Sequence, residues 1–227
     1  MLARWLGKDY ARRRALPRAQ GPLQAYLATP FPQRRQLCRE ATIVALDLET
    51  TGLDPRKDSI LSVGLVNIEG MSIRLGTAWH QVVQVEHAIA EESVVIHEIT
   101  DDQAAAGRPL SEVLPELLHR LAGRVMLAHY KNIEQNFIDA ACRRLYGAPF
   151  VIPTIDTLAL AARVFERRNH TVQTGDLRLF NLRPRYNLPR YKAHNALSDA
   201  LATAELFLAM AAEMDPGPRC RLGSFLT

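Results

Sequence analysis

The sequence has few cysteines, no long apolar run and no internal repeat. Its three cysteines, Cys38, Cys142 and Cys220, are odd in number and lack a spacing typical of metal ligands. This argues against a disulfide scaffold and indicates a reducing compartment, for which we expect the cytoplasm. The longest apolar region, residues 200–212, is interrupted by Glu205 and is too short to cross a membrane, so we expect no membrane partner.

The charge is unevenly distributed along a chain of otherwise ordinary composition. With 227 residues, 48% apolar and 23% charged, the chain is typical of one globular α/β domain. Residues 1–40 carry nine Lys and Arg against two acids, and residues 163–192 carry eight against two. The net charges of these segments are +7 and +6, so the remainder carries −9 within a total of +4. This pattern favours a protein that holds cations at its acidic centre and binds a polyanion at its basic rim. The alternative is that the arginines only form a solvated surface.

Residues 1–40 are predicted to form a basic, mainly helical N-terminal extension, and residues 41–227 to form the main domain. Prolines interrupt the extension at Pro17, Pro30 and Pro32. The segment lacks the long apolar stretch of a secretion signal and has too little serine for an organelle signal. A basic surface helix is therefore favoured over a targeting peptide.

Hydrophobic spacing predicts five strands and a set of helices in the main domain. A hairpin comes first, and strands then alternate with helices, which predicts an α/β fold with a mixed five-stranded sheet and helices on both faces. Ser111 is the predicted N-cap of the first long helix. The predicted strands are 43–48, 60–68, 71–85, 125–128 and 152–155, and the predicted helices are 111–122, 132–146, one ending near 164, 176–185 and 196–213.

Two acids stand at the end of the first predicted strand. Side chains alternate across a strand, so Asp47 and Glu49 point to the same side. Two neighbouring carboxylates repel each other and are costly to desolvate, and a divalent cation such as Mg²⁺ or Mn²⁺ removes that cost. The alternative is a strand end at which both acids are solvated.

Further candidate ligands come from two helices. His194 and Asp199 are about 140° apart on an ideal helix, so they converge if His194 lies in the preceding loop. Glu134 borders the apolar face of its predicted helix. Asp139 on the same helix lies four residues from Arg143, a spacing that indicates a solvated ion pair. Glu134 is therefore the better candidate for the remaining acid.

Four short motifs resemble, in order, those of the DEDDh 3′→5′ exonucleases, the relatives of the bacterial proofreading subunit, RNase T and oligoribonuclease. The resemblance covers residues 41–212, and a fifth segment, 94–101, also looks like part of the family pattern. The four motifs are Asp47-Leu48-Glu49-Thr50-Thr51-Gly52, Ala128-His129, Ile155-Asp156-Thr157-Leu158 and His194-Asn195-Ala196-Leu197-Ser198-Asp199-Ala200.

The resemblance implies a ribonuclease H-like fold and hydrolysis of nucleic acid from single-stranded 3′ ends. It implies two Mg²⁺ or Mn²⁺ ions, with His194 as general base and nucleoside 5′-monophosphates as products. The implied metal ligands are Asp47, Glu49, Glu134 and Asp199. The implied substrate-binding residues are Thr50, Thr51, Gly52, Glu92 and His97.

The chain departs from the family pattern at the second motif. The family commonly has Asp, preceded by Phe, where this chain has Glu134 preceded by Ile133, and Asn where it has Tyr130. A nucleic-acid-binding module that has lost catalysis through the change at Glu134 is therefore one alternative to the enzyme. Another alternative is an interaction subunit in which the basic residues 1–40 dock a partner. The chain ends soon after its last helix, so we expect a stand-alone exonuclease or one with a different, unknown partner. No motif distinguishes DNA from RNA, since that depends on contacts to the 2′-hydroxyl.

Overall fold

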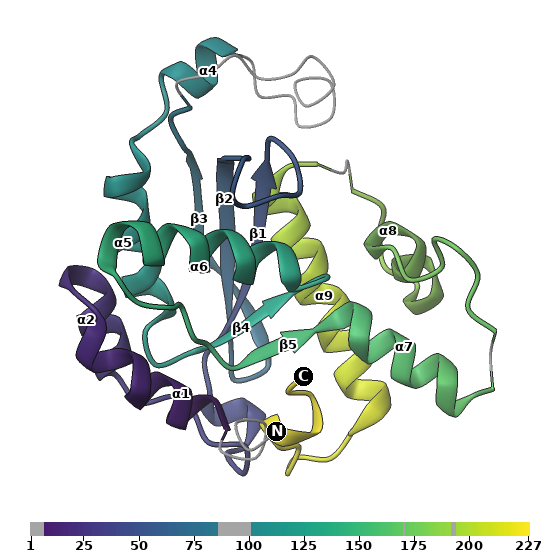
Figure 1. The fold of residues 1–227 in the computed structure, drawn as a ribbon. Helices are drawn as coiled ribbons and strands as arrows, with labels where there is room; N and C mark the ends of the chain where they lie inside the picture. The colour runs from purple at the N-terminus through teal and green to yellow at the C-terminus, as the bar shows by residue number, and fades with distance from the viewer. Residues whose placement is uncertain (1–6, 86–100, 170, 192–193) are drawn as a thin grey trace.

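The computed structural model describes residues 7–85, 101–169, 171–191 and 194–227. A mixed sheet of five strands forms its centre, in the order β3-β2-β1-β4-β5 (Figure 1). Strands β1, β2 and β3 pair antiparallel, while β4 and β5 run parallel to β1. The strands span Ile43–Thr50, Ile60–Glu69, Ser72–Val82, Val125–Ala128 and Thr154–Asp156 in chain order. The predicted five-stranded mixed sheet is confirmed.

Helices cover both faces of the sheet because β1 is apolar on both sides. Val44, Leu46 and Leu48 belong to the cluster shared with α5 (Leu110–Leu121) and α6 (Asn132–Tyr146). Ile43 and Ala45 belong to the cluster shared with α7 (Thr157–Arg167) and α9 (Ala196–Met214). This alternation is expected of a strand buried on both faces. Asp47 and Glu49 therefore lie on the face that α9 covers.

The N-terminal residues pack into the main core. Helices α1 (Gly7–Ala15) and α2 (Gly21–Ala28) lie beside α5 and α6 (Figure 1). Tyr26 is buried, stacks on Phe150 with ring centroids 5.5 Å apart, and donates a hydrogen bond of 2.8 Å to the carbonyl oxygen of Val151. The division of the chain at residue 40 stays a prediction.

The segment before β1 pairs with the segment near the C-terminus at an isolated antiparallel bridge. Residue 37 pairs with residue 221, and the Sγ atoms of Cys38 and Cys220 are 3.2 Å apart. The described residues contain no helix that is both long and apolar enough to cross a membrane.

Some predicted boundaries differ from the structure. Helix α5 begins at Leu110 with Pro109 at its N-cap, so the predicted N-cap at Ser111 is wrong. The predicted helix 176–185 is only a short α8 (Leu179–Leu182) followed by a 3₁₀ turn, Arg183–Tyr186, that contains Pro184. Because Pro184 has no backbone N–H to donate, a regular α-helix through this residue would lack a hydrogen bond. Helix α4 (Asp101–Ala105) was not predicted, and the remaining 3₁₀ turns are Leu16–Arg18, Cys38–Glu40 and Leu222–Ser224.

Candidate metal centre and active site

Three acids meet where β1 ends. Asp47 and Glu49 come from β1 and Asp199 from the first turn of α9. Among the described residues, one carboxylate oxygen from each of these three lies within 4.8 Å of the others. Loss of hydration raises the pKa of Asp47 well above its usual range, and the charges of Glu49, Glu134 and Asp199 raise it further. The site thus concentrates negative charge that a cation would offset.

A glycine on β2 allows α9 to approach this cluster. Gly64 is opposite Asp47 in the β1–β2 ladder. A Cβ atom added at Gly64 would lie 2.1 Å from the carbonyl carbon of Ala196 and from the amide nitrogen of Leu197. The first turn of α9 therefore rests directly on the sheet beside Asp47, which no other residue at position 64 would permit without displacement.

His194 lies in the loop that leads into α9, as predicted. Asn195 is the N-cap, and its side chain accepts a hydrogen bond of 3.1 Å from the backbone N–H of Ser198. The backbone N–H of His194 donates to Oδ2 of Asp199 at 3.1 Å. His194 is exposed and has a left-handed backbone, with φ of 69°. Asp199 therefore fixes the backbone of His194 as well as belonging to the acid cluster.

Glu134 is buried beside this cluster, at the start of α6. Its side chain is 2% exposed, and its Oε2 makes no hydrogen bond with any described residue. Loss of hydration raises its pKa to about 8, with contributions from the charges of Asp156 and Glu49. A buried carboxylate oxygen without a partner is costly unless something else satisfies it.

Asp139 points elsewhere, as the sequence indicated. Its Oδ2 accepts a hydrogen bond of 2.7 Å from Nε of Arg143, and its Oδ1 accepts one of 2.9 Å from the backbone N–H of Phe150. Both oxygens therefore stabilise the local fold. The second of these contacts was not foreseen.

The donor set fits divalent cations. All four acids offer hard oxygen ligands, which Mg²⁺ and Mn²⁺ prefer. The orphaned Oε2 of Glu134 and the raised pKa values of Asp47 and Glu134 are the features expected of carboxylates arranged for a cation.

Asp156, which belongs to the third motif, has a structural role. It is the N-cap of α7, and its Oδ1 accepts hydrogen bonds from the backbone N–H groups of Leu158 at 3.0 Å and of Ala159 at 3.4 Å. The same oxygen accepts a hydrogen bond of 3.0 Å from Tyr130, whose backbone is left-handed. Asp156 thus connects the end of β4 to the start of α7.

The predicted substrate-binding residues divide into two groups. Thr50, Thr51 and Gly52 form the turn after β1, where the Thr50 hydroxyl donates to the carbonyl oxygen of Gly52 at 2.7 Å. The Thr51 hydroxyl accepts a hydrogen bond of 2.9 Å from the Ser59 backbone. Glu92 and His97 lie outside the described residues.

Two arginines of the basic segments are structural and unavailable to a ligand. Arg183 is 1% exposed, donates to the carbonyl oxygens of Pro189 and Ala202, and pairs with Glu205 at 2.6 Å. Arg12 is also buried and donates to the carbonyl oxygen of Leu27. The hypothesis that these whole segments face a polyanion is therefore wrong for these two side chains. The charge count could not reveal their burial.

A pocket of about 540 Å³ adjoins the acid cluster and was not predicted. It is bordered by β1, β2, β3 and the N-terminus of α9. The polar residues that line it include Glu49, Ser62, His80, Gln81, His194 and Asn195. Ser62 could have been noticed in the sequence, because it stands within an apolar strand and alternates with Gly64.

Comparisons with known proteins agree with the fold and the motifs. A family model described as an exonuclease, RNase_T, matches residues 44–207. A PolC-type DNA polymerase III of Thermotoga maritima is 34% identical over 169 residues, which are 74% of this chain and 12% of the polymerase. Its counterpart in Staphylococcus aureus is 28% identical over 176 residues, 78% of this chain and 12% of the polymerase. The chain thus spans a small part of these curated relatives.

Solved structures of exonucleases share the fold. The nuclease domain of 3′hExo, described as a DEDDh family member and bound to rAMP, has a TM-score of 0.66 at 15% identity, covering 85% of this chain and 98% of that one. E. coli exonuclease I in a complex with single-stranded DNA has a TM-score of 0.66 at 16% identity, covering 79% of this chain and 42% of that one. The match of the family model to most of the chain, together with this ribonuclease H-like fold, shows that the chain belongs to the DnaQ-like RNase T exonuclease family.

Proposed function

We propose that this chain is a metal-dependent 3′→5′ exonuclease with Asp47, Glu49, Glu134 and Asp199 as metal ligands. The observation that carries the proposal is the meeting of Asp47, Glu49 and Asp199 within 4.8 Å. The buried, unpartnered Oε2 of Glu134 supports a fourth ligand at the same place. When bound, two divalent cations would supply the positive charge that offsets the carboxylates and the charge developing on the phosphate.

His194 is assigned as the general base. His194 lies in the loop before α9 and lines the same pocket as Glu49, which supports a role at the edge of the acid cluster. It would accept the proton of the water that attacks the terminal phosphodiester, an effect worth roughly 10²–10⁴-fold in rate. The bond from phosphorus to the 3′-oxygen of the preceding nucleotide then breaks. The products are a nucleoside 5′-monophosphate and a chain shortened by one nucleotide.

The direction of hydrolysis is tested with oligonucleotides labelled at one end. With Mn²⁺ or Mg²⁺, a 5′-labelled oligomer should give a ladder that shortens one nucleotide at a time, and a 3′-labelled oligomer should release labelled mononucleotide at once. Early release of label from the 5′ end would contradict the proposed direction. Tight binding without degradation would instead favour a nucleic-acid-binding module.

A further inference from the structure

The pocket next to the acid cluster has a chemistry of its own. It shares Glu49 with the cluster, so a substrate whose phosphate lies at the acids would extend into it on one side. None of the described residues that line it is Lys or Arg. Because these described residues supply no such cation, they are poorly suited to further phosphates, but their hydroxyl, amide and imidazole groups suit the sugar and base of one terminal nucleoside.

Ser62 is a buried polar residue in the lining of this pocket. It is 1% exposed, and its Oγ makes no hydrogen bond with any described residue. Ser62 is directly opposite Glu49 in the β1–β2 ladder, so the two Cβ atoms are roughly 5 Å apart. A buried hydroxyl beside a carboxylate offers two adjacent hydrogen-bonding groups, which match the two neighbouring hydroxyls of a ribose better than the single hydroxyl of a terminal deoxyribose.

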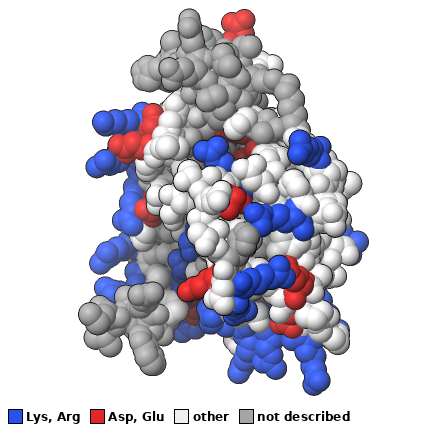
Figure 2. Space-filling view, turned by 90° about the vertical axis from the view of Figure 1, so that its right-hand side faces the viewer, with Lys and Arg blue, Asp and Glu red and all other residues white. Residues whose placement is uncertain are grey.

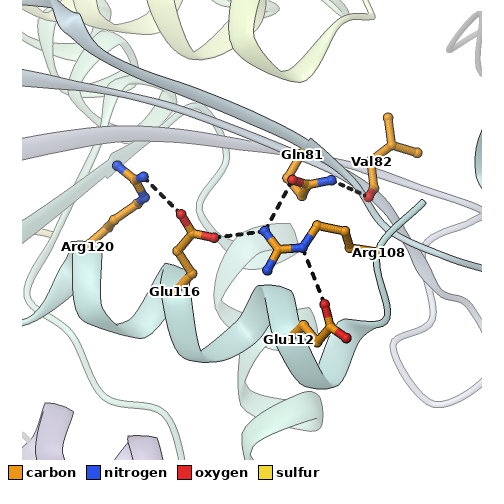
Figure 3. Close-up of polar contacts among 6 residues, drawn as sticks. All are labelled: Gln81, Val82, Arg108, Glu112, Glu116 and Arg120. Atoms are coloured by element: carbon orange, nitrogen blue, oxygen red, sulfur yellow. Dashed lines mark hydrogen bonds and ion pairs between the residues drawn. The ribbon is translucent and has the colours of Figure 1, made fainter. Parts of the chain in front are cut away.

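Gln81, another residue of the lining, belongs to a polar network that connects β3 to α5 (Figure 3). Gln81 donates to the carbonyl oxygen of Val82 at 3.0 Å, and its Oε1 is 3.4 Å from Nη1 of Arg108. The same Nη1 is 3.0 Å from Glu116, which also pairs with Arg120 at 3.0 Å. Gln81 is therefore already occupied by protein contacts, whereas the hydroxyl of Ser62 has no hydrogen-bond partner among the described residues.

We propose that Ser62 recognises the 2′-hydroxyl of the 3′-terminal nucleotide, so that the preferred substrate ends in a ribonucleotide. This inference rests on the proposed exonuclease function. One hydrogen bond to a buried group contributes about 1 kcal/mol, and leaving that group unpaired costs more, so a terminal ribonucleotide should be preferred by about tenfold.

The test uses DNA oligomers of one sequence that differ only in a terminal 3′-ribonucleotide or 3′-deoxynucleotide. The rate of release of the first nucleotide is measured for the wild type, for Ser62→Ala and for Thr203→Val. Thr203 is the matched control, because its hydroxyl is also buried and has no partner among the described residues, but it does not line the pocket.

The wild type and Thr203→Val should release the ribonucleotide about tenfold faster, and Ser62→Ala should release both at similar rates. A ratio near one in the wild type, or an unchanged ratio in Ser62→Ala, overturns the inference while leaving the exonuclease proposal intact. If no oligomer is degraded, the proposed function fails separately. The affinities of the two oligomers with Ca²⁺ present then decide whether Ser62 recognises the extra hydroxyl.

Discussion

At the scale of single residues, Glu134 is the clearest departure of this chain from the family pattern, which commonly has Asp at this position. Glu134→Gln keeps the size of the side chain but removes its charge, so we expect at least about a 100-fold loss of nuclease rate from weakened metal binding. Because the burial of Glu134 raises its pKa, the same change should not destabilise the metal-free protein. Glu134→Asp should be tolerated, or should improve the rate with Mg²⁺.

Asp139→Asn is the matched control on the same helix. Asparagine retains an oxygen that can accept from the backbone of Phe150, and loss of a partly exposed ion pair with Arg143 costs about 0–1 kcal/mol. Nuclease rates of both variants, measured at saturating Mn²⁺, check this assignment. An inactive Asp139→Asn together with an active Glu134→Gln would reverse it.

His129 gives the protein an expected sensitivity to acid. Loss of hydration lowers its pKa to about 4, and its Nδ1 lies 2.8 Å from the hydroxyl of Thr157. The imidazole of His129 therefore takes up a proton near pH 6.5 in the unfolded chain, but only near pH 4 in the folded chain. The contribution of His129 to the free energy of unfolding is full above about pH 6.5. It declines as the pH falls through this window, by up to roughly 3 kcal/mol.

The measurement is the free energy of unfolding in urea between pH 7 and pH 4. His129→Asn should flatten this part of the curve, whereas His119→Asn should leave it unchanged, because His119 is exposed on α5. Equal slopes in all three proteins would show that His129 titrates normally.

At the scale of elements, the approach of α9 to the sheet determines the geometry of the site. Gly64→Ala would push Ala196 and Leu197 away from β2 and carry Asp199 with them. A displacement of about 1 Å can cost 100-fold in rate, so we expect a loss of that order, measured as kcat well below the melting temperature.

Gly76→Ala on β3 is its control, since a Cβ atom there meets nothing within 4 Å. It should retain activity within about twofold of the wild type, as expected of a change that removes no contact. A fully active Gly64→Ala would show that α9 can shift without affecting the acids.

Elements with clear end signals were predicted well from the sequence. Helix α6 ends at Gly147, whose φ of 73° suits a glycine, and α9 begins after Asn195, a favoured N-cap. The start of α5 was misplaced, because serine is a favoured N-cap, whereas the observed N-cap is Pro109, whose side chain makes no capping hydrogen bond. The predicted range 176–185 was longer than α8, because charge and spacing alone do not show where a helix ends near Pro184.

At the scale of the whole molecule, the acids of the site were predictable but the pocket was not. Asp47 and Glu49 are two residues apart, so strand geometry alone places them together. Ser62 and Gly64 acquire their roles only through the register of β2 against β1 and the contact with α9. Such long-range pairings leave no local spacing for a single sequence to show.

Exposed Lys and Arg side chains are the groups that we expect a nucleic acid to contact. Figure 2 shows Lys and Arg side chains spread over the face on the side of α7 and α8, with acidic side chains among them. Arg178 and Arg190 are exposed and form no ion pair with a described residue. Replacing both with Gln should weaken binding of single-stranded oligomers and reduce the slope of log affinity against log salt by up to about 0.7 per lost contact.

Arg183→Gln provides the contrast. It removes a buried partner of Glu205, so it should lower stability by about 3 kcal/mol, measured by urea unfolding, with no specific change in the salt slope of the folded protein. Unchanged affinity and slope in the Arg178 and Arg190 double variant would show that this face does not contact the substrate.

The most direct test of the metal-dependent exonuclease is a Mn²⁺ titration of mononucleotide release, run in parallel on the wild type and Asp47→Asn. The wild type should be inactive in excess EDTA and should recover fully as Mn²⁺ is added. Asp47→Asn should remain folded, with a melting temperature at least as high without metal, because its substitution relieves charge repulsion among the acids. It should nevertheless stay inactive at every Mn²⁺ concentration. Full activity in EDTA, or undiminished turnover in Asp47→Asn, would contradict the account.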